Sequence, residues 1–398
     1  MTTATVALGD ARRDGKVMAL VGLAHFASHF YQLVLPPLFP FLKEDWGITY
    51  TALGFVVTTF YVASGLGQFA AGFVVDRIGA RRVLLAGMVL LAGSTAAIGA
   101  FGSWWALLPL AILAGLGNSV FHPADYTILT ASIGPSRLGR AYGTHTLGGT
   151  LGYAAAPAVV LPLAYAFGWR SALIAAGLVG LAIAALLAAN GGLLRDDRRD
   201  RQEGAAASAA PLFSAPVVLC FVYFAFFASA LIALQAFLAP ALGALFATPA
   251  AVAGAALTGY FLGNAVGIVG GGFAADRWQR PDAIIMAGLV IAGLLLLAVG
   301  RIDAGPAALP VLLATAGCLA GLTSASRDLL VRNAAPAGAT GRVFGFVYSA
   351  LDVGSAAGPL AAGMLLDGGR PDLVFVLLAG CMWAAAATVP LVHRLSRS

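Results

Sequence analysis

Between two long apolar runs, the chain carries the stretch Gly72-Phe-Val-Val-Asp76-Arg77-Ile-Gly79-Ala-Arg81-Arg82. Two hundred residues later, its first half is repeated in the same setting as Gly272-Phe-Ala-Ala-Asp276-Arg277-Trp-Gln-Arg280. A second pair supports the repeat, because Gly139-Arg140-Ala-Tyr-Gly143 recurs as Gly341-Arg342-Val-Phe-Gly345 at an offset of 202. Internal repeats indicate architecture before any single residue does, so we predict two copies of one unit.

The composition is typical of a protein embedded in a membrane. Of the 398 residues, 60% are hydrophobic and only 10% are charged, whereas charged residues approach a quarter of a soluble domain. The net charge is +6, but a basic excess in a membrane protein normally marks its cytoplasmic loops, so we expect no nucleic-acid partner. The three cysteines lie inside apolar runs without a metal-ligand spacing, which predicts neither a disulfide framework nor a zinc site.

Twelve apolar runs are each long enough to cross a hydrocarbon core about 30 Å thick. Unpaired backbone groups in lipid cost several kcal/mol, so these runs are expected to be helices. We predict an all-α membrane protein with twelve transmembrane helices in two six-helix pseudo-symmetric halves, an arrangement typical of transporters with a site between the repeats. The predicted spans are 17–42, 51–75, 83–101, 104–131, 140–167 and 171–190, then 215–240, 250–275, 283–300, 307–331, 343–366 and 373–392.

The predicted domains are an N-terminal six-helix bundle at 1–190, a cytoplasmic linker at 191–214 and a C-terminal six-helix bundle at 215–398. The linker combines mixed charge with a run of small residues, which is typical of a flexible, solvated segment. With the N-terminus in the cytoplasm, eighteen Lys and Arg residues fall in inner segments and four in outer loops, with one more inside a span. The positive-inside rule therefore predicts that both termini are cytoplasmic, in a bacterial-type inner membrane.

The repeat, the twelve spans and the loop between spans two and three resemble the major facilitator superfamily. The residues that match its loop signature are Gly72, Asp76, Arg77, Gly79, Arg81 and Arg82. The resemblance implies that this loop, with Asp276 and Arg277 in the second copy, is a latch for the outward-facing state. The second copy departs from the pattern at Gln279 and Pro281. The alternative is that the charged residues only anchor the loop at the lipid surface.

Within that superfamily, three stretches resemble the fosmidomycin-resistance type of exporter. They are Ser28-His29 in span one, Gly117-Asn-Ser119-Val-Phe-His122-Pro123 in span four and Gly148-Gly149-x-x-Gly152-x-x-x-x-Pro157 in span five. Two departures weaken the transfer of substrate identity. The chain has Ala124 before Asp125 where the group tends to place an acid directly after His-Pro, and Gln32-Leu33 where span one often has an acid.

Ionisable side chains inside the spans are functional candidates, because each is costly at membrane depth without a partner or water. His25 and His29 stand four apart, and His122 and Asp125 three apart, so each pair shares a helix face. An imidazole beside a carboxylate can exchange a proton near neutral pH, and we predict that His122 and Asp125 form the proton-coupling centre, with Asp352 as the next candidate. Alternatives are a helix-to-helix hydrogen bond for His122 and plain packing for His25. We predict no metal site, because His25 and His29 lack further ligands at helical spacing.

Arg327 is the one permanently charged cation placed deep in a predicted span. It could bind an anionic substrate group through a bidentate contact, or it could form a structural pair with Asp352 or Asp125. His145, one turn into span five, is expected to have a gating or structural role. The residues expected to contact the substrate are His25, His29, Gln32, Tyr126, Asn264, Arg327 and Asp328.

These features predict a secondary active transporter that works by alternating access, and not an enzyme. The favoured activity is proton-coupled export of a small anionic or polar organic compound. The alternative is proton-coupled uptake of an organic anion, and a more remote one is a polytopic membrane enzyme. The expected partners are the substrate, protons and the lipid bilayer. The energy source is the proton gradient without a cofactor, and the expected state is a monomer.

Overall fold

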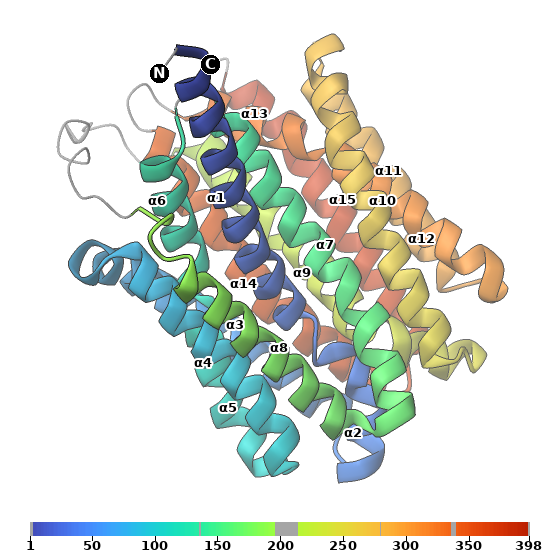
Figure 1. The fold of residues 1–398 in the computed structure, drawn as a ribbon. Coiled ribbons are helices and arrows are strands. Elements are labelled where there is room, and N and C mark those ends of the chain that lie inside the picture. The colour runs from blue at the N-terminus through green and yellow to red at the C-terminus, as the bar shows by residue number, and fades with distance from the viewer. Residues whose placement is uncertain (1–2, 135–136, 196–213, 279, 336–339, 397–398) are drawn as a thin grey trace. The chain divides into compact units, whose positions relative to one another are not determined.

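A computed structural model of the chain describes residues 3–134, 137–195, 214–278, 280–335 and 340–396. Every regular element in these residues is helical (Figure 1). The helices of the first half are α1 (Thr3–Gln32), η1 (Pro36–Leu38), α2 (Phe39–Trp46), α3 (Tyr50–Ile78), α4 (Ala80–Phe101), α5 (Trp104–Asn118), α6 (Phe121–Ser132), α7 (Leu138–Phe167) and α8 (Trp169–Ala189). Those of the second half are α9 (Ala215–Phe246), α10 (Ala250–Arg277), α11 (Pro281–Val299), α12 (Gly305–Leu322), α13 (Ser324–Ala334), α14 (Thr340–Asp367) and α15 (Pro371–Leu395).

The predicted twelve-helix membrane architecture is confirmed. Within the described residues, 12 helical segments are long and apolar enough to cross a membrane, the sixth ending at Ala189 and the seventh beginning at Ala215. The chain is therefore a multi-pass membrane protein. The charged residues near the N-terminus are part of α1, and Arg137 Nη1 lies 3.0 Å from Asp14 Oδ2. Residues 196–213 of the predicted linker lie outside the described residues.

Three of the predicted spans are not continuous helices. The first consists of α1, η1 and α2, because Pro36 and Pro37 have no N–H to continue the hydrogen bonding of α1. The fourth changes from α5 to α6 after Ser119, whose Oγ donates to Leu116 O at 2.6 Å. The tenth changes from α12 to α13 at Thr323, whose hydroxyl donates to the carbonyl three residues earlier at 2.7 Å. The breaks in the fourth and tenth spans thus match each other in the two halves.

The chain divides into two compact units. The first contains Met1–Val34, Ala63–Ala156 and Leu163–Ala205, and the second contains Leu35–Val62, Pro157–Pro162 and Ala206–Ser398. Each unit buries a core of aliphatic and aromatic side chains, such as Leu84 and Phe121 in the first and Phe224 and Phe375 in the second.

Glycines let the helices approach to backbone contact at matching places in each unit. In the first unit, a Cβ on Gly152 of α7 would collide with the carbonyl oxygen of Phe26 in α1. In the second unit, a Cβ on Gly354 of α14 would collide in the same way with Ala225 in α9. Small residues at such crossings allow the close van der Waals packing that holds membrane helices together. Gly152 and Gly354, which are 202 residues apart in the sequence, therefore make equivalent helix–helix contacts in the two units.

In the second unit, the first turn of α3 is held by the last residue of α14. Asp367 accepts hydrogen bonds from the backbone N–H groups of Tyr50 and Thr51 at 3.0 and 2.7 Å, and from the Thr51 hydroxyl at 2.6 Å. A carboxylate is well suited to this position, because the first N–H groups of a helix have no partner inside the helix and carry a partial positive charge. Gly54 of α3 lies against the backbone of Pro359 in α14, so the contact continues along both helices.

We predict that Asp367→Asn loosens the first turn of α3. The amide keeps one acceptor oxygen but loses the negative charge, and the site is exposed, so the backbone amides near Thr51 should exchange hydrogen several-fold faster. Hydrogen–deuterium exchange of peptides covering the start of α3 is the measurement. The matched control is Asp372→Asn, whose carboxylate contacts Arg370 and not α3. Equal exchange in both variants and the parent would contradict the role given to Asp367.

Candidate functional site

Four of the five histidines lie together in the first unit, on three helices. α1 places His25 and His29 one turn apart on the same face. α6 begins directly before His122, and Pro123 is tolerated in its first turn because that position needs no N–H donor within the helix. α7 brings His145 against α1, since its glycines permit close approach. An added Cβ on Gly149 would lie 2.7 Å from Nδ1 of His29 and 2.9 Å from Cδ2 of His25.

Asp125 lies at the centre of this cluster and is completely buried. Its Oδ2 is 3.1 Å from Nε2 of His145 and 3.5 Å from Nδ1 of His25. Its Oδ1 has no hydrogen-bond partner among the described residues. A buried carboxylate needs donors from its own protein, so Asp125 fixes the positions of two imidazoles that come from two other helices.

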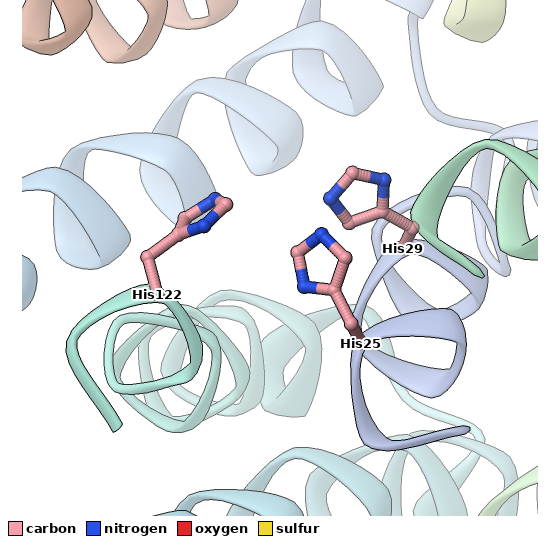
Figure 2. A group of neighbouring side chains, drawn as sticks. All are labelled: His25, His29 and His122. Atoms are coloured by element: carbon pink, nitrogen blue, oxygen red, sulfur yellow. The ribbon is translucent and has the colours of Figure 1, made fainter. Parts of the chain in front are cut away.

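The imidazole rings are in direct contact with one another. The ring centroid of His25 is 3.5 Å from that of His145, 4.4 Å from that of His29 and 5.1 Å from that of His122. Figure 2 shows His25 and His29 on one helix and His122 on another, with the three rings around a common space. His25 is buried, His29 is half-buried and His122 is exposed, so the cluster reaches the surface of the first unit at His122.

The histidines that contact Asp125 are His25 and His145, and the coupling role expected of His122 and Asp125 stays a prediction. Asp125 turns inward to His25 and His145, whereas His122 is accessible and its ring lies 6.1 Å from that of Tyr126. Three residues along a helix place two side chains on neighbouring positions, but the helices packed around α6 decide which partner each one meets. His145 was expected only as a gating or structural residue, and its contact with Asp125 depends on the crossing of α6 and α7.

A second polar network adjoins the histidines. Gln32, a predicted substrate contact, accepts a hydrogen bond from the hydroxyl of Tyr153 at 2.5 Å and donates to Oδ1 of Asn118 at 3.2 Å. Ser28 also donates to Oδ1 of Asn118, at 2.8 Å, and Asn118 donates to Ser64 at 2.9 Å. The network ties α1, α3, α5 and α7 together. The roles of Asn118, Tyr153 and Ser64 were missed, because each belongs to a different span.

In the second unit, Arg327 is paired with its neighbour in sequence. Its Nε donates to Oδ1 of Asp328 at 3.0 Å, and the hydroxyl of Tyr348 donates to the same oxygen at 3.0 Å. The guanidinium also lies over the ring of Phe224, 4.9 Å from its centroid. Within the described residues of the second unit, the carboxylate that contacts Arg327 is thus that of Asp328.

The other predicted substrate contacts and coupling residues are more widely spread. Asn264 in α10 donates to the carbonyl oxygen of Gly317 at 3.3 Å, which ties α10 to α12. Tyr126 is exposed, and its ring lies 5.0 Å from that of His145. Asp352 lies on α14 with a half-buried side chain. Asn264 and Asp352 therefore belong to the second unit, and the histidine cluster belongs to the first.

The predicted latch residues of the first copy lie at the junction of α3 and α4. Asp76 and Arg77 are in the last turn of α3 and are exposed. Gly79 separates the helices with φ of 93°, a conformation that side-chain-bearing residues rarely adopt, so the turn requires glycine. Nη1 of Arg81 donates to Gly191 O, after α8, at 3.0 Å.

In the second copy, Arg277 is the last residue of α10, and the side chain of Asp276 lies outside the described part of the structure. The latch function stays a prediction for both copies.

Comparison with known families decides the identity of this fold. The sequence model of the Major Facilitator Superfamily matches residues 21–238 and again residues 218–397. The chain belongs to the Major Facilitator Superfamily. The predicted resemblance is confirmed, and the fold and relatives of this facilitator are those of transporters and not of enzymes.

Two relatives of the facilitator cover part of its length. It is 27% identical over 177 residues to the fosmidomycin resistance protein of Escherichia coli, over 44% of this chain and 43% of that protein. It is 28% identical over 166 residues to a probable sulfoacetate transporter of Cupriavidus necator, over 42% of this chain and 38% of that protein. The matched segments span less than half of either relative.

The fold of the facilitator is also similar to that of a solved structure. This is a bacterial homologue of the human lysosomal transporter Spinster in an inward-facing and occupied conformation. The TM-score is 0.74 with 14% sequence identity, and the match covers 96% of this chain and 97% of that one. At this identity the likeness shows the shared fold alone.

We predict that Asp125→Asn destabilises this facilitator, because the amide loses the negative charge beside both imidazoles and weakens the hydrogen bond with Nε2 of His145. A buried hydrogen bond to a charged group contributes about 1.5–3 kcal/mol to stability. The measurement is thermal unfolding of the purified protein in detergent. The control is Asp282→Asn, which removes a carboxylate from a partly exposed pair with His393, 2.8 Å away, where solvent screens the charge. Similar losses in the two variants would show that Asp125 does not hold the cluster.

Proposed function

We propose that this facilitator is a secondary active transporter that exports a small anionic or polar organic compound in exchange for protons, by alternating access. The family supplies the transport function. The observation that carries the proton coupling is the environment of Asp352 in α14. The charge preference rests on Arg327 and on one relative, a probable sulfoacetate transporter, whose named compound is an organic anion.

Asp352 is an acid inside a membrane-spanning helix. Its side chain is half-buried and has no hydrogen-bond or ion-pair partner among the described residues. An ionised carboxylate at such a place is costly without a partner or water, so its charge is expected to change during the transport cycle. Asp125, the other predicted coupling acid, instead has two imidazoles against it, and we assign it to holding those rings.

Arg327 supplies a permanent positive charge for an anionic substrate. The guanidinium has five N–H donors, and the one on Nε is taken by Asp328. The ring of Phe224 supports the guanidinium from one side, which pre-orders it for a planar, bidentate contact. A carboxylate or sulfonate of the substrate would share the guanidinium with Asp328. The competing carboxylate lowers the affinity for the anion, so the substrate can also be released.

The same proposal places the protein in a bacterial-type cytoplasmic membrane with both termini in the cytoplasm. Its basis is the excess of Lys and Arg in alternate loops. The loop between α3 and α4, with Asp76, Gly79 and Arg81, is proposed as the latch of the outward-facing state.

Reconstitution into proteoliposomes tests the function. Fosmidomycin and sulfoacetate are the first probes, because the names of the two relatives contain them. A pH gradient imposed in either direction separates export by antiport from uptake by symport, because the two require opposite gradients to concentrate the probe. Counterflow of unchanged probe is expected. Chemical conversion of the probe would overturn the transporter assignment, and flux that ignores the pH gradient would overturn proton coupling.

We predict that Asp352→Asn abolishes accumulation driven by a pH gradient while exchange of substrate for substrate survives. Exchange requires no net proton movement, so the loss of one titrating group should separate the two activities. Both fluxes are measured on the same reconstituted variant. The control is Asp303→Asn in an exposed loop, where Asn keeps the oxygen that accepts from the N–H of Gly305. If Asp352→Asn still concentrates substrate, coupling lies on another residue.

We predict that Arg327→Lys weakens binding of an anionic substrate by about tenfold or more, because lysine keeps the charge but loses the planar fork. Half-saturation in the counterflow assay is the measurement. Arg332→Lys, at the end of α13, makes the same chemical change outside the Arg327–Asp328 pair. Parent-like half-saturation in both Arg327→Lys and Arg327→Ala would remove the anion site and favour a neutral or cationic substrate.

A further inference from the structure

The three imidazoles of His25, His29 and His122 are arranged as a set of metal ligands. One ring nitrogen from each lies within 4.8 Å of the others. Figure 2 shows one ring nitrogen of each histidine turned toward the shared space between α1 and α6. The sequence alone indicated only two of these ligands, because the third comes from another span. The structure thus supplies the donor that was missing from the pair at helical spacing.

The nitrogens on the outer edges of two rings support this arrangement. Nδ1 of His25 and Nδ1 of His29 are buried and have no hydrogen-bond partner among the described residues. Nδ1 of His29 faces the backbone of α7 at Gly149, and Nδ1 of His25 faces Asp125. The opposite ring nitrogen, Nε2, is therefore the one that both histidines present to the shared space. The orientation of the two rings thus leaves Nε2 of each as the nitrogen available to a ligand in the shared space.

Asp125 lies on the side of His25 that faces away from the shared space. Its Oδ2 lies 3.5 Å from Nδ1 of His25 and 3.1 Å from Nε2 of His145. In metal sites, a ligating histidine usually donates its other ring N–H to a carboxylate, which fixes the tautomer and raises the basicity of the ligating nitrogen. Asp125 is placed to take this role for His25 once their 3.5 Å separation shortens as the metal binds, and His145 holds Asp125 on the other side. Asp125 is therefore a positioning residue and not a ligand of this site.

We propose that His25, His29 and His122 bind one divalent transition-metal ion, with zinc as the best fit. Imidazole suits zinc, copper, nickel and iron, whereas magnesium and calcium prefer oxygen ligands. Zinc takes three protein ligands in open sites and leaves its fourth position for water or a substrate group. The exposed side of His122 gives that fourth position access from the surface of the first unit.

The geometry needs only a small adjustment. With Zn–N bonds of about 2.0–2.1 Å, two nitrogens of a tetrahedral site lie about 3.3 Å apart. The ligand atoms now lie up to 4.8 Å apart. Side-chain rotations that move each ring nitrogen by about 1 Å can bring them to the tetrahedral spacing. The exposed His122 has room to make this movement, whereas His25 is held by Asp125.

The test is zinc binding by the full chain, purified through an affinity tag that contains no histidine. Calorimetric titration with zinc chloride should give one ion per chain. His29→Gln and His122→Gln should each raise the Kd on the order of 100-fold or more, and Asp125→Asn should raise it on the order of 10-fold through the second coordination sphere. Cobalt chloride is the spectroscopic probe, since a tetrahedral cobalt spectrum should appear in the parent and be lost in His122→Gln.

His393→Gln is the matched control, because His393 is the one histidine outside the cluster and pairs with Asp282 at the surface. It should leave the Kd within about twofold of the parent. Thermal unfolding without metal shows whether each variant is folded. Because His122 is exposed and His29 is half-buried, His122→Gln is expected to disturb the fold less than His29→Gln. Absence of stoichiometric zinc binding in the parent would overturn the proposal. Loss of binding in His145→Gln but not in His29→Gln or His122→Gln would overturn this ligand set.

The metal site and the proposed transport function can fail separately. Zinc binding is measured on the purified protein without any transport, and gradient-driven flux is measured without added metal.

Discussion

A carboxylate enclosed by membrane helices must find its hydrogen-bond donors within the protein, and Asp125 imposes this condition on the first unit. His145 of α7 forms a hydrogen bond with Asp125 at 3.1 Å and His25 of α1 lies 3.5 Å from it, so the carboxylate holds three helices together. The histidine cluster depends on this arrangement. If α7 were displaced, His145 would move away from Asp125, and His25 would lose its stacking contact with the ring of His145.

Close backbone contact is what allows the side chains to meet. Gly149 leaves the space that the rings of His25 and His29 occupy against α7, and Gly152 lets the backbones of α1 and α7 touch one turn further along. The equivalent contact at Gly354 in the second unit is accompanied by different side chains, because α9 presents Phe224 and Phe227 to the guanidinium of Arg327, whereas α1 presents histidines to α6 and α7. The two halves thus share a packing scheme but have diverged in chemistry. One half gathers titratable imidazoles, and the other places a single guanidinium against aromatic rings.

Much of the fold could be predicted from the sequence, because length and hydrophobicity alone determine which segments can cross a membrane. The twelve spans followed from that constraint, the repeat followed from the recurring glycine, aspartate and arginine motifs, and the pair His25 and His29 followed from helical spacing. The partners of Asp125 could not be predicted in the same way. His122 is three residues from Asp125 and His145 is twenty, and only the crossing of α6 and α7 brings the more distant histidine into contact. The pair of Arg327 with Asp328 was also missed, because neighbours along a helix normally point in different directions. The long, flexible arginine side chain overcomes that difference.

The interruptions at Ser119 and Thr323 have a mechanical consequence. At each, a side-chain hydroxyl takes up a carbonyl that a straight helix would have bonded through its backbone. A bend at either point therefore leaves little polar backbone exposed to lipid, because the hydroxyl supplies a donor where the helical hydrogen bonding changes. Since the same arrangement occurs in both halves, the fourth and tenth spans can bend at corresponding places.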